Sequence, residues 1–260
     1  MKSTRLVFLT LVLATTASAA EDLSVVPIEK LIDDLTLIDS QALGLHGTAS
    51  VLGFIAEDEP PQFGGGVLGS PVPKTPPQMR ELARRGSTIV PQLISHLDDK
   101  RPTKLTIGKD FFMFRYFSDE YDPKTRSKQE TSFPGGNLER NFKGEYTVKV
   151  GDVCYALIGQ IVNRSLSPVR YQPTAGLVIN SPIEAPALIE RVKKDWGSLD
   201  AVGHKASLIA DAQSGDQLWT FGPALVRLRF YFPDDYKRLK DGNLRKRIAE
   251  FESDEKERRQ

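Results

Sequence analysis

The chain has 260 residues, of which 40% are hydrophobic and 27% charged, with 35 lysines and arginines against 34 aspartates and glutamates. A formal net charge of +1 provides no bulk attraction to nucleic acid or to an anionic membrane, so the composition argues against both as partners. The single cysteine, Cys154, rules out an internal disulfide, so a packed core must stabilise the fold.

Residues 1–20 have the order of a secretory signal peptide. Lys2 and Arg5 are basic, residues 6–13 form an apolar run, and Ala17-Ser18-Ala19 is a small-x-small cleavage pattern. The run is shorter than the roughly 20 residues that span a bilayer. We therefore predict cleavage near Ala19 or Ala20, export to the periplasm or the cell exterior, and no membrane span.

The mature chain begins with an amphipathic segment. Apolar residues recur at helical spacing between positions 28 and 38, which predicts one buried stripe on a helix. Residues 57–75 are rich in glycine and proline and predict a surface loop. We expect a single mainly helical domain over residues 21–233, followed by a charged C-terminal helix over residues 234–260.

The segment MRELARRGSTIVPQLISHLDD, residues 79–99, predicts two short helices that fold back on each other. A capping box over residues 75–78 would open the first helix, and Gly86 would end it. The stripe of the second helix is Val90, Leu93, Ile94 and Leu97.

These residues resemble one unit of a HEAT-type helical repeat: a helix, a glycine turn, and a second helix that opens Val-Pro-x-Leu-Ile and ends in acidic residues. No second copy of equal quality recurs at a fixed period, as a regular array requires. The longer pattern also resembles a group of exported bacterial proteins that have no assigned activity. The resemblance implies a mainly α fold, an irregular HEAT-like α-α array.

The fold class that we expect adds a small inserted β-hairpin and long loops to this array. Residues 103–117 predict the hairpin, residues 118–145 a polar loop, and residues 146–150 a further short strand. The apolar run VCYALIGQIV, residues 153–162, predicts the most buried helix, capped by Asp152. Gly159 within it indicates the close approach of a neighbouring segment. We expect a further helix after a capping box at residues 181–184, and a helix rather than a strand over residues 224–232.

Asp119, Glu120 and Asp122 form the densest local group of carboxylates. Loop carboxylates can bind calcium, and two close carboxylates can hydrolyse a glycosidic bond, so this loop is the candidate metal site. The alternative is an ordinary solvated acidic turn. The histidines lie far apart, and none has the spacing of a zinc ligand. Cys154 lies in an apolar run, which predicts a buried structural thiol.

Arg164, Arg170, Tyr171 and Gln172 lie in the segment that follows the most buried helix, and they are the candidate binding residues. Arginine and tyrosine are enriched among the residues that dominate interface energies. Alternatively, Arg170 only binds the last carbonyl groups of a helix.

The sequence thus predicts an exported, non-catalytic binding or scaffold protein that needs no cofactor. Its helices would frame a groove for a protein or peptide partner. The alternative is an envelope hydrolase that uses a carboxylate or metal site around Asp119 to Asp122.

Overall fold

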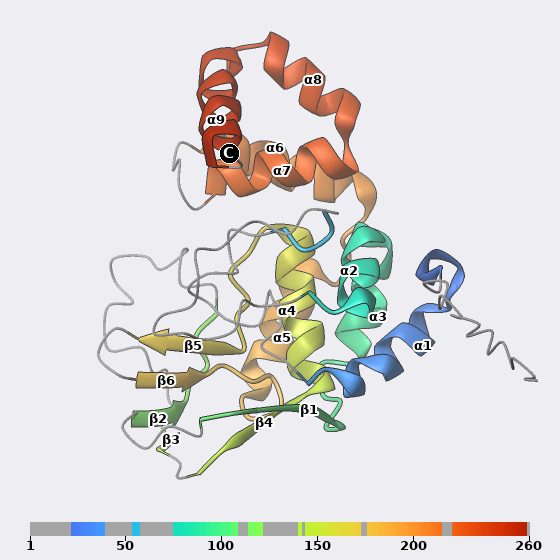
Figure 1. The fold of residues 1–260 in the computed structure, drawn as a ribbon, viewed down its shortest axis with the longest axis vertical. Helices are drawn as coiled ribbons and strands as arrows, with labels where there is room; N and C mark the ends of the chain where they lie inside the picture. Colours follow the sequence, from blue (N-terminus) through green and yellow to red (C-terminus); the bar gives the residue numbers. More distant parts are fainter. Residues whose placement is uncertain are drawn as a thin grey trace, which may run out of the picture.

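The computed structural model describes residues 22–39, 54–57, 75–108, 114–121, 140–141, 144–172, 176–214 and 220–258. Helices predominate in these ranges, and strands form two small sheets beside them (Figure 1). The prediction of a mainly α fold with a small β insertion is therefore confirmed. No helix in the described ranges combines the length and the apolarity that a membrane crossing requires. The predicted signal peptide and most of the predicted loop over 57–75 lie outside the described residues.

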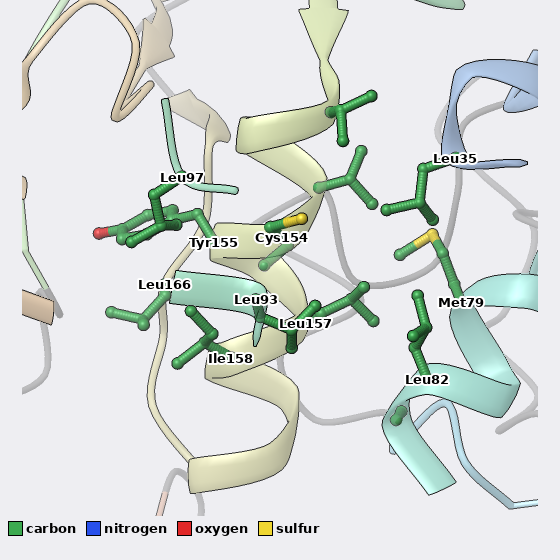
Figure 2. Close-up of a cluster of buried hydrophobic side chains, with 14 of the residues drawn as sticks. Leu35, Met79, Leu82, Leu93, Leu97, Cys154, Tyr155, Leu157, Ile158 and Leu166 are labelled. Atoms are coloured by element: carbon green, nitrogen blue, oxygen red, sulfur yellow. The ribbon is translucent and has the colours of Figure 1, made fainter. Parts of the chain in front are cut away.

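The central element is helix α4 (Val150–Val162), in which every residue is buried. Its sequence is apolar around most of the helix circumference, and such a helix must be covered on all sides. Figure 2 shows Cys154 and Leu157 of α4 in the cluster that also contains Met79 and Leu82. The predicted burial of this helix and of the Cys154 thiol is confirmed, and burial raises the pKa of the thiol.

Helices α2 (Pro77–Arg84) and α3 (Val90–Ser95) both pack against α4. Met79 and Leu82 on α2, and Val90 and Leu93 on α3, have no exposed surface. The two helices pack more on α4 than on each other, which differs from the fold-back pair that we predicted. The physical reason is that α4 offers apolar surface to both stripes at once. Gly86 between the helices has a φ of +66°, so the predicted left-handed stop is confirmed.

The first amphipathic segment forms helix α1 (Ile28–Asp33) and the short 3₁₀ helix η2 (Asp34–Leu37). Leu31, Ile32 and Leu35 are fully buried, which confirms the predicted stripe.

The capping groups expected for α2 and for the helix after residue 180 are wrong, whereas Asp152 does cap the start of α4, from within the helix. No side chain caps α2; instead the Gln78 amide donates to the Asp34 carbonyl over 3.1 Å, joining α2 to the first segment. Asp152 is not the N-cap of α4 but its third residue, and its carboxylate accepts the Lys149 N–H over 2.8 Å. Residues 181–184 form a turn, and helix α5 (Pro186–Trp196) begins after it.

The strands do not pair as the predicted hairpin. Strand β1 (Pro102–Ile107) pairs antiparallel with β4 (Tyr146–Lys149), which confirms a strand near 146–150. Strand β2 (Phe114–Phe117) belongs to a second sheet, where it pairs parallel with β6 (Gly176–Ile179). Every residue of β6 is buried, so an apolar strand distant in sequence pairs with β2 in place of its neighbour β1.

The second sheet has the order β3-β2-β6-β5. Its outer strands are β3 (Arg140–Asn141) and β5 (Val169–Gln172), and both pair antiparallel with their neighbours. Strand β5 includes the candidate binding residues Arg170, Tyr171 and Gln172.

The last helices form a unit with a hydrophobic cluster of its own, which we call the C-terminal lobe. Its elements are α6 (Ala201–Gln213), α7 (Gly222–Tyr231), α8 (Pro233–Asp241) and α9 (Arg245–Arg258). The helix predicted over residues 224–232 is confirmed as part of α7, whereas the charged C-terminal segment is two helices rather than one. Figure 1 shows α8 and α9 in red at one end of the molecule, beyond α6 and α7.

Candidate functional site

The site is built around the end of α4. Asn163 ends the helix in the left-handed conformation, with a φ of +59°, and directs the chain toward Arg164. The Arg164 guanidinium donates to the carbonyls of Val162 and Asn163 over 3.4 and 3.0 Å and forms an ion pair with Asp211 at 2.5 Å. It therefore has the helix-capping role that we had considered for Arg170.

An aromatic pair connects this end of α4 to the end of β2. Trp196, the last residue of α5, lies under Arg164, with 5.4 Å between the guanidinium carbon and the ring centroid. Its indole N–H donates to the Tyr121 hydroxyl over 3.0 Å. Arg191 lies over the Tyr121 ring at 4.7 Å. We call Arg164, Trp196, Tyr121 and Arg191 the arginine–aromatic cluster.

Glu120 and Arg170 form an ion pair next to this cluster. The Glu120 Oε2 lies 2.7 Å from a terminal nitrogen of Arg170 and accepts its Nε–H over 2.9 Å. The Glu120 side chain is only 2% exposed, and the Arg170 side chain is 20% exposed. The Glu120 N–H donates to the Asn180 side chain over 3.3 Å, so β2, β5 and the end of β6 are joined at this point.

The pairing changes the interpretation of the acidic group. The Glu120 carboxylate is engaged by a guanidinium, Asp119 is half-buried beside it, and Asp122 lies outside the described residues. Within the described ranges, no group of three or more histidine, cysteine, aspartate or glutamate side chains is arranged to hold a metal ion. The Glu120 carboxylate thus ties β5 to the segment that follows β2.

The predicted binding residues are only partly brought together. Arg170 pairs with Glu120, and Arg164 lies over Trp196, which in turn binds the Tyr121 hydroxyl. Tyr171 and Gln172 lie on β5, and the described structure does not extend to their side chains.

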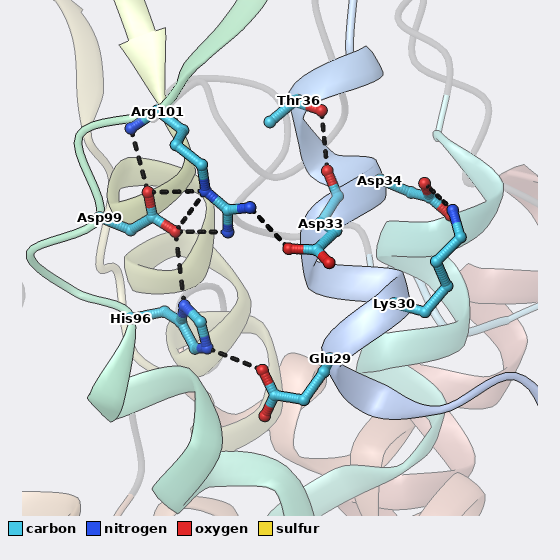
Figure 3. A network of polar contacts seen from close by, with 8 residues as sticks. All are labelled: Glu29, Lys30, Asp33, Asp34, Thr36, His96, Asp99 and Arg101. Atoms are coloured by element: carbon cyan, nitrogen blue, oxygen red, sulfur yellow. Dashed lines mark hydrogen bonds and ion pairs between the residues drawn. The ribbon is translucent and has the colours of Figure 1, made fainter.

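The repeat-like segment contributes to packing and to a surface network of polar contacts (Figure 3). His96 Nε2 lies 3.0 Å from a Glu29 oxygen, and Nδ1 lies 3.4 Å from an Asp99 oxygen. Arg101 binds Asp99 and Asp33, each at 2.6 Å. Although burial opposes ionisation of Asp99, hydrogen bonds from Arg101 hold the pKa of that carboxyl below its ordinary value. Glu29 and Asp99 contact different ring nitrogens of His96, so the two carboxylates cannot bind one metal ion together with that ring.

No sequence pattern identified Tyr121, Arg191 and Trp196 as one group. These residues come from the end of β2 and from α5, and no spacing rule connects positions 121 and 196. A tryptophan in the last turn of an amphipathic helix normally predicts only core packing. No family model, curated protein or solved structure matches the chain, so an assignment of function depends on the site itself.

Proposed function

We propose that the chain is an exported, non-catalytic binding protein, and that the arginine–aromatic cluster is its contact surface for a protein partner with carboxylate side chains. The signal-like pattern of residues 1–20 supports the proposed export. The resemblance of residues 79–99 to a HEAT-type unit supports a scaffold role for the helices around α4. No groove is part of this proposal.

The single observation that carries the proposal is the setting of Arg191. Its side chain is exposed on α5, and its guanidinium lies 4.7 Å from the Tyr121 ring centroid. The Trp196 indole holds the Tyr121 hydroxyl, so the surface under the guanidinium is fixed from two elements. Among the described residues, no carboxylate forms an ion pair with Arg191.

These contacts suit recognition of a carboxylate. A guanidinium held over an aromatic ring can still bind a carboxylate through two parallel hydrogen bonds. Because the ring restricts the arginine before binding, less side-chain entropy is lost in the complex. Arginine, tyrosine and tryptophan are also the residue types that most often dominate interface energies.

The test compares two positions on the same helix. A photo-reactive amino acid replaces Arg191 in one chain and Lys193 in another, and the proteins crosslinked in cells are identified and purified. Lys193 is exposed on the other side of α5, where it pairs with Glu190 at 3.2 Å. We expect a discrete adduct from position 191 only.

The affinity of the purified partner for each variant then tests whether Arg191 lies in the contact surface. Arg191→Ala should weaken binding by roughly tenfold or more, which is the scale of an interface hot spot, whereas Lys193→Ala should change it by less than about twofold. Both variants remove one positive charge, so the comparison isolates the location of the charge. Equal affinities for the wild type and Arg191→Ala would refute the proposed surface.

A further inference from the structure

The C-terminal lobe is attached to the end of α4 through carbonyl groups that the helix itself cannot satisfy. The last four carbonyls of a helix have no partner within it. Two of those in α4 are bound from the lobe: Arg227 Nε donates to Gln160 O, and His204 Nε2 donates to Ile161 O over 2.9 Å. The joint between the lobe and α4 therefore depends on two side chains that can carry positive charge.

His204 is enclosed in this joint as a neutral ring. The residue is 1% exposed, and the centroids of Tyr231 and Phe232 lie 5.1 and 5.5 Å from its ring. Since Nε2 donates to the Ile161 carbonyl, Nδ1 is unprotonated in the neutral form. No acceptor for a proton on Nδ1 is present among the described residues.

The charged group that acts on the pKa of His204 is the Arg227 guanidinium of α7. Arg227 is 1% exposed, donates to the Pro223 carbonyl over 3.0 Å and lies 4.8 Å from the Phe54 ring centroid. No carboxylate within the described ranges forms an ion pair with it. Burial lowers the pKa of Arg227 to about 10, so the group remains charged at neutral pH.

The other ionisable groups near the joint are already neutral or paired. Burial raises the pKa of Tyr231, which therefore stays neutral. On α6, Lys205 pairs with Asp235 of α8 at 3.3 Å, and Asp211 pairs with Arg164. The segments of α4 and η4 (Gly86–Ile89) that face α6 contain no acidic or basic side chain.

A positive charge on His204 would have one favourable contact, because the C-terminus of a helix attracts cations. Arg227 already occupies the adjacent carbonyl, and the site is buried. Burial is the largest influence and lowers the pKa of His204; the hydrogen bond to Ile161 opposes this effect, and Arg227 adds to it.

We propose that the joint is an acid-sensitive latch: when His204 takes up a second proton beside Arg227, the C-terminal lobe loosens from α4. Neither His204 nor Arg227 belongs to the arginine–aromatic cluster, although Arg164 of that cluster pairs with Asp211 of the lobe. Above the ordinary histidine pKa of about 6.5 the latch has its full strength. As the pH falls below that value, the open state binds the proton more tightly than the closed state. One linked proton changes the opening equilibrium by at most about tenfold per pH unit.

Amide hydrogen exchange on the mature chain between pH 7.5 and 5 tests the latch, with rates corrected for intrinsic chemistry. We expect exchange from α6 and α7 to rise by up to about tenfold per pH unit below pH ~6.5, while α2 and α3 change little. His204→Gln keeps a donor for the Ile161 carbonyl but cannot ionise, so it should abolish the rise. His96→Gln removes the surface histidine of the Glu29 network and should leave the rise intact.

A pH-independent exchange rate in α6 and α7 of the wild type would overturn the latch, as would a rise that persists in His204→Gln. If His204→Gln does not fold, exchange of the imidazole C2 proton in the wild type gives the answer. A titration midpoint for His204 below about 6.5 supports the latch, and a midpoint at or above that value overturns it.

Discussion

Substitution of Gly159 by alanine tests how closely the chain after α4 returns to the helix. A Cβ at this position would lie 2.7 Å from the Arg164 carbonyl oxygen, 2.9 Å from Leu166 Cβ and 3.0 Å from the Leu166 nitrogen, whereas ordinary contacts are 3.4–4 Å. Two of these atoms belong to the backbone, which cannot rotate away. Overpacking of this kind costs roughly 1–3 kcal/mol, and the better helix propensity of alanine returns about 1 kcal/mol. We take the upper half of the range and expect a net loss of about 1–2 kcal/mol in the free energy of unfolding.

Urea unfolding of the mature chain measures the loss, since the midpoint should fall while the slope with denaturant stays constant. The matched control is Gly203→Ala on the exposed face of α6, where the nearest atom to the new Cβ is a carboxylate oxygen of the N-cap residue Asp200 at 3.2 Å, a side-chain atom rather than backbone. That variant should equal the wild type within about 1 kcal/mol. If Gly159→Ala is as stable as the wild type or more stable, segment 164–166 does not abut the helix, and the account of the α4 terminus is wrong.

Two other substitutions test buried charges. Burial raises the pKa of Asp152, although Ser181, the Lys149 N–H and the Tyr146 hydroxyl favour its ionised form. The unfolded chain therefore releases this proton at lower pH than the folded chain. The stability of the wild type relative to Asp152→Asn should be greatest below pH ~4 and should decline as the pH rises, by at most about 1.4 kcal/mol per pH unit. Urea unfolding from pH 4 to 7 measures this difference, and a difference that does not change with pH would contradict the assigned burial. Glu120→Gln should lower the free energy of unfolding by about 2–3 kcal/mol, because it leaves the mostly buried Arg170 guanidinium without its carboxylate. In a double-mutant cycle with Arg170→Gln, the losses of the two single variants should not be additive. Additive losses would mean that the ion pair contributes nothing to stability.

The sequence predicted the elements whose pattern is local. The apolar periodicity around Leu31 and Leu93 placed helices correctly, and the unbroken apolar run around Cys154 identified the most buried helix. Gly159 also indicated the close approach of a neighbour, and the return of the chain at Leu166 is that neighbour. These features depend on interactions between residues a few positions apart, which the sequence displays directly.

Pairings between distant segments were not predictable in the same way. The hairpin interpretation of residues 103–117 assumed that neighbouring strands pair, whereas β2 pairs with β6 from beyond α4. The same holds for the candidate site. Glu120 and Arg170 were identified separately, as a metal ligand and a binding residue, and no sequence pattern showed that they form an ion pair. Tyr121 and Trp196 were missed because only the folded chain brings them together.

Because side chains of the C-terminal lobe bind the last carbonyls of α4, the order in which the chain is synthesised affects when this helix end can be completed. The groups that complete Gln160 and Ile161 reside at positions 227 and 204, more than 40 residues downstream. During synthesis, the carbonyls of Gln160 and Ile161 lack these partners until α6 and α7 have been made. A fragment that stops at residue 200 would leave both carbonyls without these partners at the end of the buried helix α4, so we expect it to be less stable than the whole chain.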